Sequence, residues 1–391
     1  TYFDFNNEKI KEIAKESSKL GIELFVLDDG WFGERNNDDC SLGDWFVNEE
    51  KLKGGLNSLA TDINKMGMQF GLWFEPEMIS PKSKLYEEHP DWCIHIDGRI
   101  RSEARKQLIL DLSRDEVCEA VIKMITDVLK SAPISYVKWD MNRNMTEIGS
   151  TAWPAKKQKE IAHRYMLGLY KILENITSNF PNILFESCSG GGGRFDGGML
   201  YYMPQTWTSD DTDAIERLMI QEGTSLVYPT SSMGSHVSAV PNHQVHRITP
   251  LNTRGVVAMA GSFGYELDVT KMNEEEKEEV KKQVEFYKNI RSTVQFGDLY
   301  RLKSSFDSNE AAWMNLSKDG KEVVVSYVKK YSEANVIPRR LKVKALDENS
   351  LYEVIETGEV FGGDELMYIG LEIGELMGDY QAKNWTLRKV D

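Results

Sequence analysis

Short apolar runs alternate with amphipathic stretches from residue 2 to about residue 290. Continuous apolar runs such as Leu24–Leu27 are typical of strands covered on both faces. Stretches such as Glu8–Leu20 and Arg114–Lys130 repeat apolar positions at helical spacing, and Ser113 is the expected N-cap of the second. An alternation of strands and helices predicts a parallel α/β architecture.

Nine segments of this region have strand character, one more than an eight-stranded barrel needs. They are Tyr2–Phe5, Leu24–Leu27, Gln69–Phe74, Leu108–Leu112, Ile134–Arg143, Asn182–Glu186, Pro204–Thr208, Ser232–Ala239 and Val256–Ala260. Stretches rich in Pro, Trp and charge flank Leu108–Leu112, so we assign that segment to an excursion between the third and fourth strands. The pattern therefore predicts a (β/α)8 TIM barrel over residues 1–294, with Ile134–Arg143 as its fourth strand.

The period changes after about residue 293. Short alternating segments separated by turn residues predict an antiparallel β-sandwich over residues 295–391. The expected strands are Tyr300–Ser305, Ala311–Asn315, Glu322–Tyr331, Arg340–Ala345, Ser350–Glu356 and Met367–Leu371.

Clustered polar residues follow five of the expected barrel strands. The clusters are Asp28/Asp29, Glu75/Glu77, Lys138/Asp140, Cys188 with the glycines after it, and Asp210/Asp211. Alternate residues of a strand share a face, so Lys138, Asp140 and Asn142 are expected to point the same way. Barrel enzymes keep their chemistry at this end of the strands, which makes Asp140 a candidate catalytic carboxylate.

Two carboxylates across a barrel mouth are what glycosidic cleavage requires, because one attacks or activates water and the other protonates the leaving oxygen. Tryptophans next to the same strand ends favour a sugar substrate, since sugars stack on indole rings. These are Trp31, Trp45, Trp73, Trp139 and Trp207.

Each assignment has a structural alternative. Asp140 could be an ion-pair partner of Lys138, Asp210 could cap the helix expected over Ala214–Gly223, and the glycine loop could be a tight turn. Lys138 could also form a Schiff base, although a fixed charge that holds a substrate hydroxyl fits better. His236, His243 and His246 match a metal set only loosely, so we expect neither a metal nor a cofactor.

The formal net charge of −15 argues against nucleic acid and anionic membranes as partners, because both need a basic face. The four cysteines, Cys40, Cys93, Cys118 and Cys188, form no CxxC pair and are typical of reduced thiols, which favours a cytoplasmic location. No signal peptide is present. The chain opens on Thr1 with no Met, and Tyr2–Phe5 already has strand character, so we expect it to be part of a longer enzyme.

Long ordered motifs resemble the α-galactosidases of glycoside hydrolase family 36. They are Leu27–Gly33, Leu42–Trp45, Gly71–Met78, Tyr136–Arg143, Ser187–Arg194, Trp207–Asp213 and Pro241–Gln244. The resemblance covers nearly the whole expected barrel. It implies a retaining enzyme that hydrolyses terminal α-linked galactose from oligosaccharides such as raffinose or melibiose.

The resemblance also implies roles for single residues. Asp140 would be the nucleophile and Asp210 the acid/base, about 5–5.5 Å apart as retention requires. The remaining implied residues bind the sugar: Asp28 and Asp29 hold two hydroxyls, Trp73 shapes the pocket, and Arg105, Lys138 and the Cys188/Gly191 loop hold the other hydroxyls.

The sequence departs from the family in two ways. Family members usually carry a large N-terminal β domain, which this sequence lacks. Because that domain takes part in the tetramers of bacterial members, the resemblance implies a homo-oligomer without fixing the number of subunits. Ala104 and Lys106 stand beside Arg105 where the family more often has Gly and Asn. The alternatives are an α-N-acetylgalactosaminidase or a transgalactosylase on the same barrel, or a carbohydrate-binding remnant without catalysis.

Overall fold

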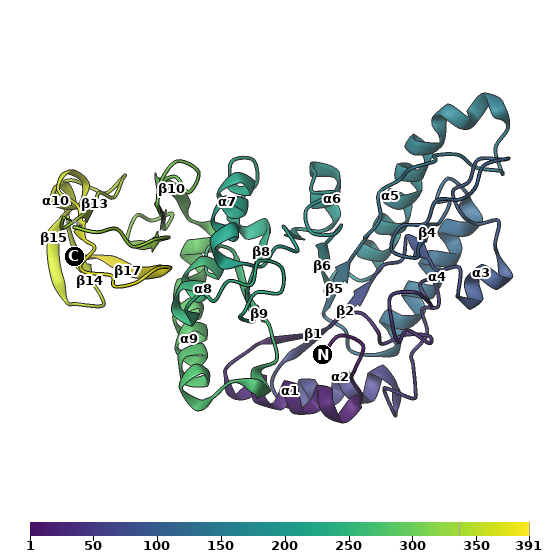
Figure 1. Cartoon of the computed structure of the whole chain (residues 1–391), viewed down its shortest axis with the longest axis horizontal. Coiled ribbons are helices and arrows are strands. Elements are labelled where there is room, and N and C mark those ends of the chain that lie inside the picture. Colours follow the sequence, from purple (N-terminus) through teal and green to yellow (C-terminus); the bar gives the residue numbers. More distant parts are fainter. Residues whose placement is uncertain (336, 391) are drawn as a thin grey trace. The chain divides into compact units, whose positions relative to one another are not determined.

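The computed structural model describes residues 1–335 and 337–390 and divides into two compact units, Thr1–Thr206 and Trp207–Asp391. Figure 1 labels the elements of each unit.

Parallel strands form the centre of the N-terminal unit. The strands are β1 (Leu24–Leu27), β2 (Gln69–Phe74), β5 (Tyr136–Trp139), β6 (Leu184–Ser187) and β7 (Gln205–Trp207). They pair in the order β1-β2-β5-β6-β7, and each strand is parallel to its neighbours. All their carboxyl ends therefore lie along the same edge of the sheet, which is where the polar clusters were predicted.

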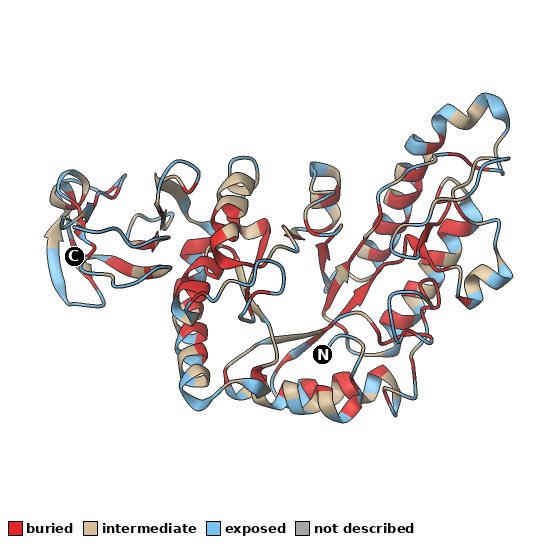
Figure 2. Ribbon diagram, in the orientation of Figure 1, coloured by how far each residue is buried: buried red, intermediate tan, exposed pale blue. Residues whose placement is uncertain are grey.

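Helices accompany these strands. They are α1 (Asn7–Lys19), α2 (Gly55–Lys65), α3 (Lys84–Glu88), α4 (Asp115–Ser131), the 3-10 helix η1 (Ala155–Glu160), α5 (Ile161–Asn179) and α6 (Gly197–Tyr202). Of these, α1, α2, α4 and α5 match predicted helices, whereas the short α3, η1 and α6 were not predicted. Their apolar faces and the strands build one continuous core, whose buried segments are red in Figure 2. Phe70, Leu72 and Phe74 on one face of β2 are completely buried, and Trp73 on the other face is buried as well, as expected for a strand covered on both faces.

The segment Leu108–Leu112 lies outside the parallel sheet, as predicted. Its strand β4 (Leu108–Ile109) pairs antiparallel with β3 (Met78–Ile79), which follows β2 directly. The excursion between β2 and β5 thus carries its own small sheet.

Two local predictions in this unit were wrong. Tyr2–Phe5 forms no strand and begins with a turn; the rings of Phe3 and Phe5 lie near Lys51, whose Nζ is 4.8 Å from the Phe5 ring centroid. Without that strand, β5 is the third strand of the parallel sheet and not the fourth. Ser113 does not cap α4, because its hydroxyl donates to Asp111 instead; Arg114 occupies the N-cap position.

The C-terminal unit begins with further α/β elements: α7 (Ala214–Ser225), η2 (Thr230–Ser232), β8 (Met233–Ser238), α8 (Leu251–Ala258), β9 (Ser262–Glu266), η3 (Val269–Lys271) and α9 (Glu274–Phe296). Strands β8 and β9 pair in parallel. Val256–Ala260 was predicted as a strand, but its first three residues end α8. Val256 and Val257 are buried, and a short, wholly buried apolar run looks the same in a helix and in a strand.

Antiparallel strands make up the rest of the chain. The main sheet has the order β10-β11-β12-β17-β14-β15, and β13 pairs with β16. The bounds are β10 (Asp298–Lys303), β11 (Glu310–Leu316), β12 (Glu322–Lys329), β13 (Arg340–Leu341), β14 (Leu351–Val354), β15 (Glu359–Gly362), β16 (Leu371–Glu372) and β17 (Gln381–Val390). Met367–Leu371 was predicted as a strand, but α10 (Gly363–Tyr368) takes its first half. The sequence reading also missed β17, which lies in the middle of this sheet.

Candidate active site

Strand register gathers polar side chains at the carboxyl edge of the N-terminal unit. Trp73 of β2 is the register partner of Lys138 of β5, and Lys138 is the partner of Glu186 of β6. Residues two apart along a strand share a face, so Glu75 and Asp140 continue the same row beyond the strand ends. A common face of Lys138, Asp140 and Asn142 was predicted from strand alternation; β5 ends at Trp139, and Asn142 reaches Asp140 from beyond the strand through a hydrogen bond of 2.8 Å.

Asp140 is a buried carboxylate held by three donors. Its Oδ2 accepts from the Trp73 indole Nε1 at 3.1 Å and from Asn142 Nδ2 at 2.8 Å, and its Oδ1 accepts from the Met141 backbone nitrogen at 2.8 Å. Only 5% of Asp140 is exposed. Neutral donors orient the carboxylate without forming an ion pair, so its negative charge stays available for chemistry.

Lys138 forms an ion pair with Asp28, whose Oδ2 lies 3.1 Å from Lys138 Nζ. Burial opposes the charge of Lys138, but Asp28, Glu186 and Asp140 together raise its pKa well above the usual range. A permanently protonated amine cannot attack a carbonyl, which argues against the Schiff-base alternative. Lys138 instead supplies a fixed positive charge beside Asp140.

Asp29 is bound by a buried arginine that the sequence reading did not single out. Arg35 donates to Asp29 Oδ1 from Nε at 3.0 Å and to Oδ2 from Nη2 at 2.8 Å, and Arg35 itself is 1% exposed. This two-point contact fixes the plane of the Asp29 carboxylate. Asp28 and Asp29 therefore differ in their partners: Asp28 faces Lys138, and Asp29 faces Arg35.

The glycine loop after β6 places a thiol next to Asp140. Burial and the neighbouring Asp140 carboxylate raise the pKa of the Cys188 thiol well above its usual value, so this thiol stays protonated. Gly190 and Gly191 have φ angles of +52° and +85°, a left-handed backbone that favours glycine. The backbone nitrogen of Gly190 donates to Asn142 Oδ1 at 3.2 Å, which ties the loop to the end of β5.

Arg105 lies on an exposed turn, in the left-handed region with a φ of +52°, and Lys106 beside it has a φ of +58°. Its positive charge acts on buried Glu75. Arg105 is therefore close enough to Glu75, the neighbour of Asp140, for its charge to act there.

Asp210 belongs to the C-terminal unit and is exposed. Its Oδ1 accepts from the Trp207 indole Nε1 at 3.1 Å. Capping α7 was the structural alternative to a catalytic role for Asp210. The N-cap of α7 is Asp213, whose side chain accepts from the Ile215 and Glu216 backbone nitrogens. Asp210 is thus not needed to cap α7.

The two glutamates of Glu75-Pro76-Glu77 were noticed in the sequence but given no role. Both are buried, at 1% and 0% exposure. Glu77 accepts from Arg194 at 2.7 and 2.8 Å, from the Tyr165 hydroxyl at 2.6 Å and from Trp139 Nε1 at 3.0 Å. Burial opposes its charge, but Arg194 and these donors lower its pKa.

Glu75 has a different environment, because it shares the partner Asn142 with Asp140. Burial first, and then the Asp140 charge, raise its pKa to about 8. Two glutamates directly after an apolar strand were the available signal in the sequence, but the partners of each glutamate come from distant segments.

The expected stacking rim of tryptophans is not present. Exposure is 0% for Trp31 and Trp139, 2% for Trp73, and 4% for Trp45 and Trp207. Three of these indole nitrogens hold site groups instead: Trp73 binds Asp140, Trp139 binds Glu77 and Trp207 binds Asp210. Their main role here is to orient carboxylates.

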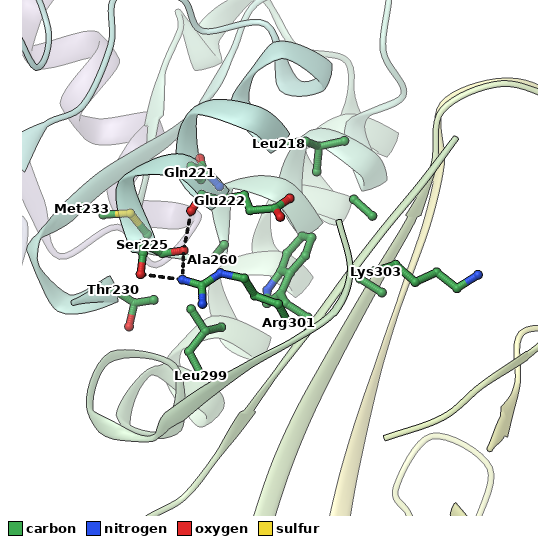
Figure 3. Close-up of a pocket in the computed structure, with 13 residues that line it drawn as sticks. Leu218, Gln221, Glu222, Ser225, Thr230, Met233, Ala260, Leu299, Arg301 and Lys303 are labelled. Atoms are coloured by element: carbon green, nitrogen blue, oxygen red, sulfur yellow. Dashed lines mark hydrogen bonds between the residues drawn. The ribbon is translucent and has the colours of Figure 1, made fainter. Parts of the chain in front are cut away.

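A small hollow in the C-terminal unit offers no competing site (Figure 3). It lies among α7, β10 and β11, has a volume of about 40 Å³, and is lined by apolar groups such as Leu218, Met233 and Ala260. Arg301 crosses it to bind the Ser225 hydroxyl at 2.7 Å. Ligand pockets usually measure about 300–1,000 Å³, so this hollow is a packing defect.

Within residues 1–335 and 337–390, no group of three or more His, Cys, Asp or Glu side chains is arranged to hold a metal ion. Across the same residues, no helix is long and apolar enough to cross a membrane.

Comparison with known families matches two profiles. The Melibiase profile matches residues 1–297, and the profile of the glycosyl hydrolase family 36 C-terminal domain matches residues 310–387.

Similar proteins with known activity include α-galactosidase AgaA of Geobacillus stearothermophilus, which is 62% identical over 390 residues, and α-galactosidase Mel36A of Lactobacillus acidophilus, which is 51% identical. Each alignment covers 100% of this chain and 53% of the relative, so the chain spans about half the length of these relatives.

Solved structures agree with these matches. The crystal structure of AgaA superposes with a TM-score of 0.98, covering 100% of this chain and 54% of that one. A variant of AgaA in complex with raffinose, 61% identical to this chain, has the same TM-score and coverage. The likeness confirms the predicted fold class, a TIM-barrel α/β region followed by an antiparallel β domain.

Proposed function

The chain belongs to glycoside hydrolase family 36, and on that premise we propose that it carries the catalytic barrel of a retaining α-galactosidase. The proposed substrates are terminal α-linked galactosides, including oligosaccharides such as raffinose and melibiose. The observation that supports this most directly is Asp140, a buried carboxylate with three neutral donors at a strand end, beside a permanent cation.

The proposed reaction is a double displacement. An Asp140 oxygen attacks the anomeric carbon while Asp210 gives its proton to the departing glycosidic oxygen, which leaves a galactosyl ester on Asp140. Asp210 then takes a proton from water, the water oxygen attacks the same carbon, and the ester bond breaks to release galactose and ionised Asp140. Two inversions retain the anomeric configuration.

The other predicted residues are proposed to bind the sugar. Asp28 and Asp29 accept hydrogen bonds from two hydroxyls, and Lys138 donates to another. Trp73 shapes the pocket while it holds Asp140, and Arg105 with the Cys188/Gly191 loop contacts the remaining hydroxyls. This role for the loop is supported by the position of Cys188 against Asp140, where an N-acetyl group on the sugar would have to fit.

The test is hydrolysis of p-nitrophenyl α-galactoside, with the first-formed anomer observed by NMR. We expect α-galactose, and a loss of at least about 10³-fold in kcat for Asp140→Ala. Asp210→Asn and Asp211→Asn form a matched pair, and only the first should abolish turnover. An active Asp140→Ala variant or a β-anomeric first product would overturn the mechanism.

The same assay separates the alternatives. Comparable turnover of p-nitrophenyl α-N-acetylgalactosaminide would identify an α-N-acetylgalactosaminidase, and galactosyl transfer to a sugar acceptor in preference to water would identify a transgalactosylase. Galactoside binding without turnover would identify a binding protein.

Three further features belong to this proposal. We place the boundary between barrel and β domain at residues 294 and 295; the two separate profile matches, to residues 1–297 and 310–387, support a division of the chain near this point. A cytoplasmic location is supported by four free cysteines. A homo-oligomer, implied by resemblance to bacterial family members, is measurable by light scattering.

A further inference from the structure

Glu75 and Asp140 are joined by one residue. The Asn142 backbone nitrogen donates to Glu75 Oε1 at 2.5 Å, and the Asn142 side-chain nitrogen donates to Asp140 Oδ2 at 2.8 Å. Phe74 and Trp139, which precede the two carboxyl residues, are register partners in β2 and β5. The two carboxyl groups therefore share a face on adjacent strands, and any change at Glu75 reaches Asp140 through Asn142.

The polar partners of Glu75 are neutral. Besides Asn142, Gln107 Nε2 approaches Glu75 Oε2 at 3.3 Å. Glu77, two residues away and equally buried, has the ion pair with Arg194 that Glu75 lacks among residues 1–335 and 337–390. A buried carboxylate without a hydrogen-bonded cation is costly, whereas a neutral carboxylic acid is tolerated.

Three charged groups face Glu75 from the surrounding elements. Asp140 at the end of β5 repels an ionised Glu75, while Arg105 before β4 and Arg35 after β1 attract it from a distance. Burial and Asp140 outweigh the two arginines, so the pKa of Glu75 rises to about 8.

Gln107 provides an acceptor for the proton of a neutral Glu75. Gln107 is 1% exposed, and its carbonyl oxygen Oε1 has no hydrogen-bond partner. Rotating the terminal amide would turn this oxygen toward Glu75 Oε2, where it can accept a hydrogen bond from the acid. Gln107 can therefore pair with Glu75 Oε2 in the neutral form of the acid, as a neutral partner that does not require a charge on Glu75.

We propose that Glu75 is a positioning residue that acts as a neutral carboxylic acid, and that it orients the nucleophile Asp140 through Asn142. This inference rests on the proposed function, because orienting Asp140 matters for rate only if Asp140 attacks the sugar. A neutral Glu75 leaves the pair with a single negative charge, located on the attacking group. An ionised Glu75 would repel the Asp140 carboxylate and push it out of its hydrogen bonds with Asn142 and Trp73.

The test is the rate of galactosylation by the intact protein with 2,4-dinitrophenyl α-galactoside, measured before steady state from pH 5 to 10. This phenolate leaves without an acid, so Asp210 does not control the alkaline limb. We expect the wild-type rate to fall several-fold as the pH rises through about 8. Gln is a neutral isostere of the protonated acid, so the galactosylation rate of Glu75→Gln should stay within about threefold of the wild-type rate at pH 6. The rate of this variant should not decrease as the pH rises through about 8.

Glu75→Ala is the matched variant, and it should lose about tenfold at pH 6 because Asn142 loses its anchor. If the Glu75→Gln variant is inactive, or if its rate falls at alkaline pH as the wild-type rate does, the inference is wrong. The proposed function still stands in that case, provided that the wild-type protein turns over the substrate. Absence of phenolate release by wild type overturns the proposed function itself. If the variants do not fold, infrared titration of wild type replaces them: a protonated carboxylic acid lost near pH 8 supports the inference, and its absence at pH 6 refutes it.

Discussion

The indole Nε1 of Trp73 donates to Asp140 Oδ2 at 3.1 Å, and this contact joins the end of β5 to a residue of the neighbouring strand β2. Trp73 is in turn fixed through its carbonyl oxygen, which accepts from Trp31 Nε1 at 2.9 Å. The orientation of Asp140 thus depends on a row of buried indoles that begins at the end of β1.

Trp73→Phe should lower kcat for α-galactoside hydrolysis by about tenfold, since a hydrogen bond to a charged group contributes about 1.5–3 kcal/mol and two other donors remain. The measurement is steady-state kinetics at pH 6. Trp385→Phe, which changes a buried tryptophan of the antiparallel sheet, is the control and should leave kcat unchanged. Equal effects of the two substitutions would count against a role for the indole contact.

Glu77→Gln should destabilise the fold by about 3–5 kcal/mol, because it leaves Arg194 buried without its ion-pair partner. Glu160→Gln removes the exposed pair with Arg164 and should cost less than about 0.5 kcal/mol. Urea unfolding at pH 7 compares them. Because the pKa of folded Glu77 is lowered, its contribution is present at neutral pH and is lost as the pH falls through that lowered pKa.

Glu75 should make the protein less stable at pH 8 than at pH 5. Its folded pKa is raised from 4.5 to about 8, so between these values the folded state holds a proton that the unfolded state has released. Stability then falls as the pH rises, by at most about 1.4 kcal/mol per pH unit. Urea unfolding across this range should show a smaller fall for Glu75→Gln, and an identical fall would contradict an uncharged Glu75.

Lys106→Asn should stabilise the protein by about 0.5–1 kcal/mol, since Lys106 has a φ of +58° and Asn tolerates the left-handed region better. Lys53→Asn, at an exposed turn without a positive φ, is the control and should give no gain. Thermal unfolding distinguishes them, and a lower melting temperature for Lys106→Asn would show that the lysine makes an important contact.

Local pattern was sufficient for the α/β order, for most helices and for the polar strand ends. Alternation predicted a common face for Lys138, Asp140 and Asn142 because successive strand residues point to opposite sides. Asn142 lies beyond the end of β5, and its contact with Asp140 depends on the loop after the strand. Pattern failed at Val256–Ala260, where buried apolar residues belong to a helix, and at Tyr2–Phe5, where Phe5 is buried in a segment that forms no strand. Periodicity cannot separate these cases, since the same residues satisfy either arrangement.

The partners of each carboxyl group were decided by the tertiary structure. Nothing local to Glu75-Pro76-Glu77 shows that one glutamate meets Arg194, 117 positions later, and that the other meets Asp140. The tryptophans near the strand ends could equally have lined a sugar-binding rim, but packing between strands buries them and turns their indole nitrogens onto carboxylates. Charge state and side-chain orientation depend on burial and on contacts between distant segments, so the sequence could locate the chemistry but not assign the proton.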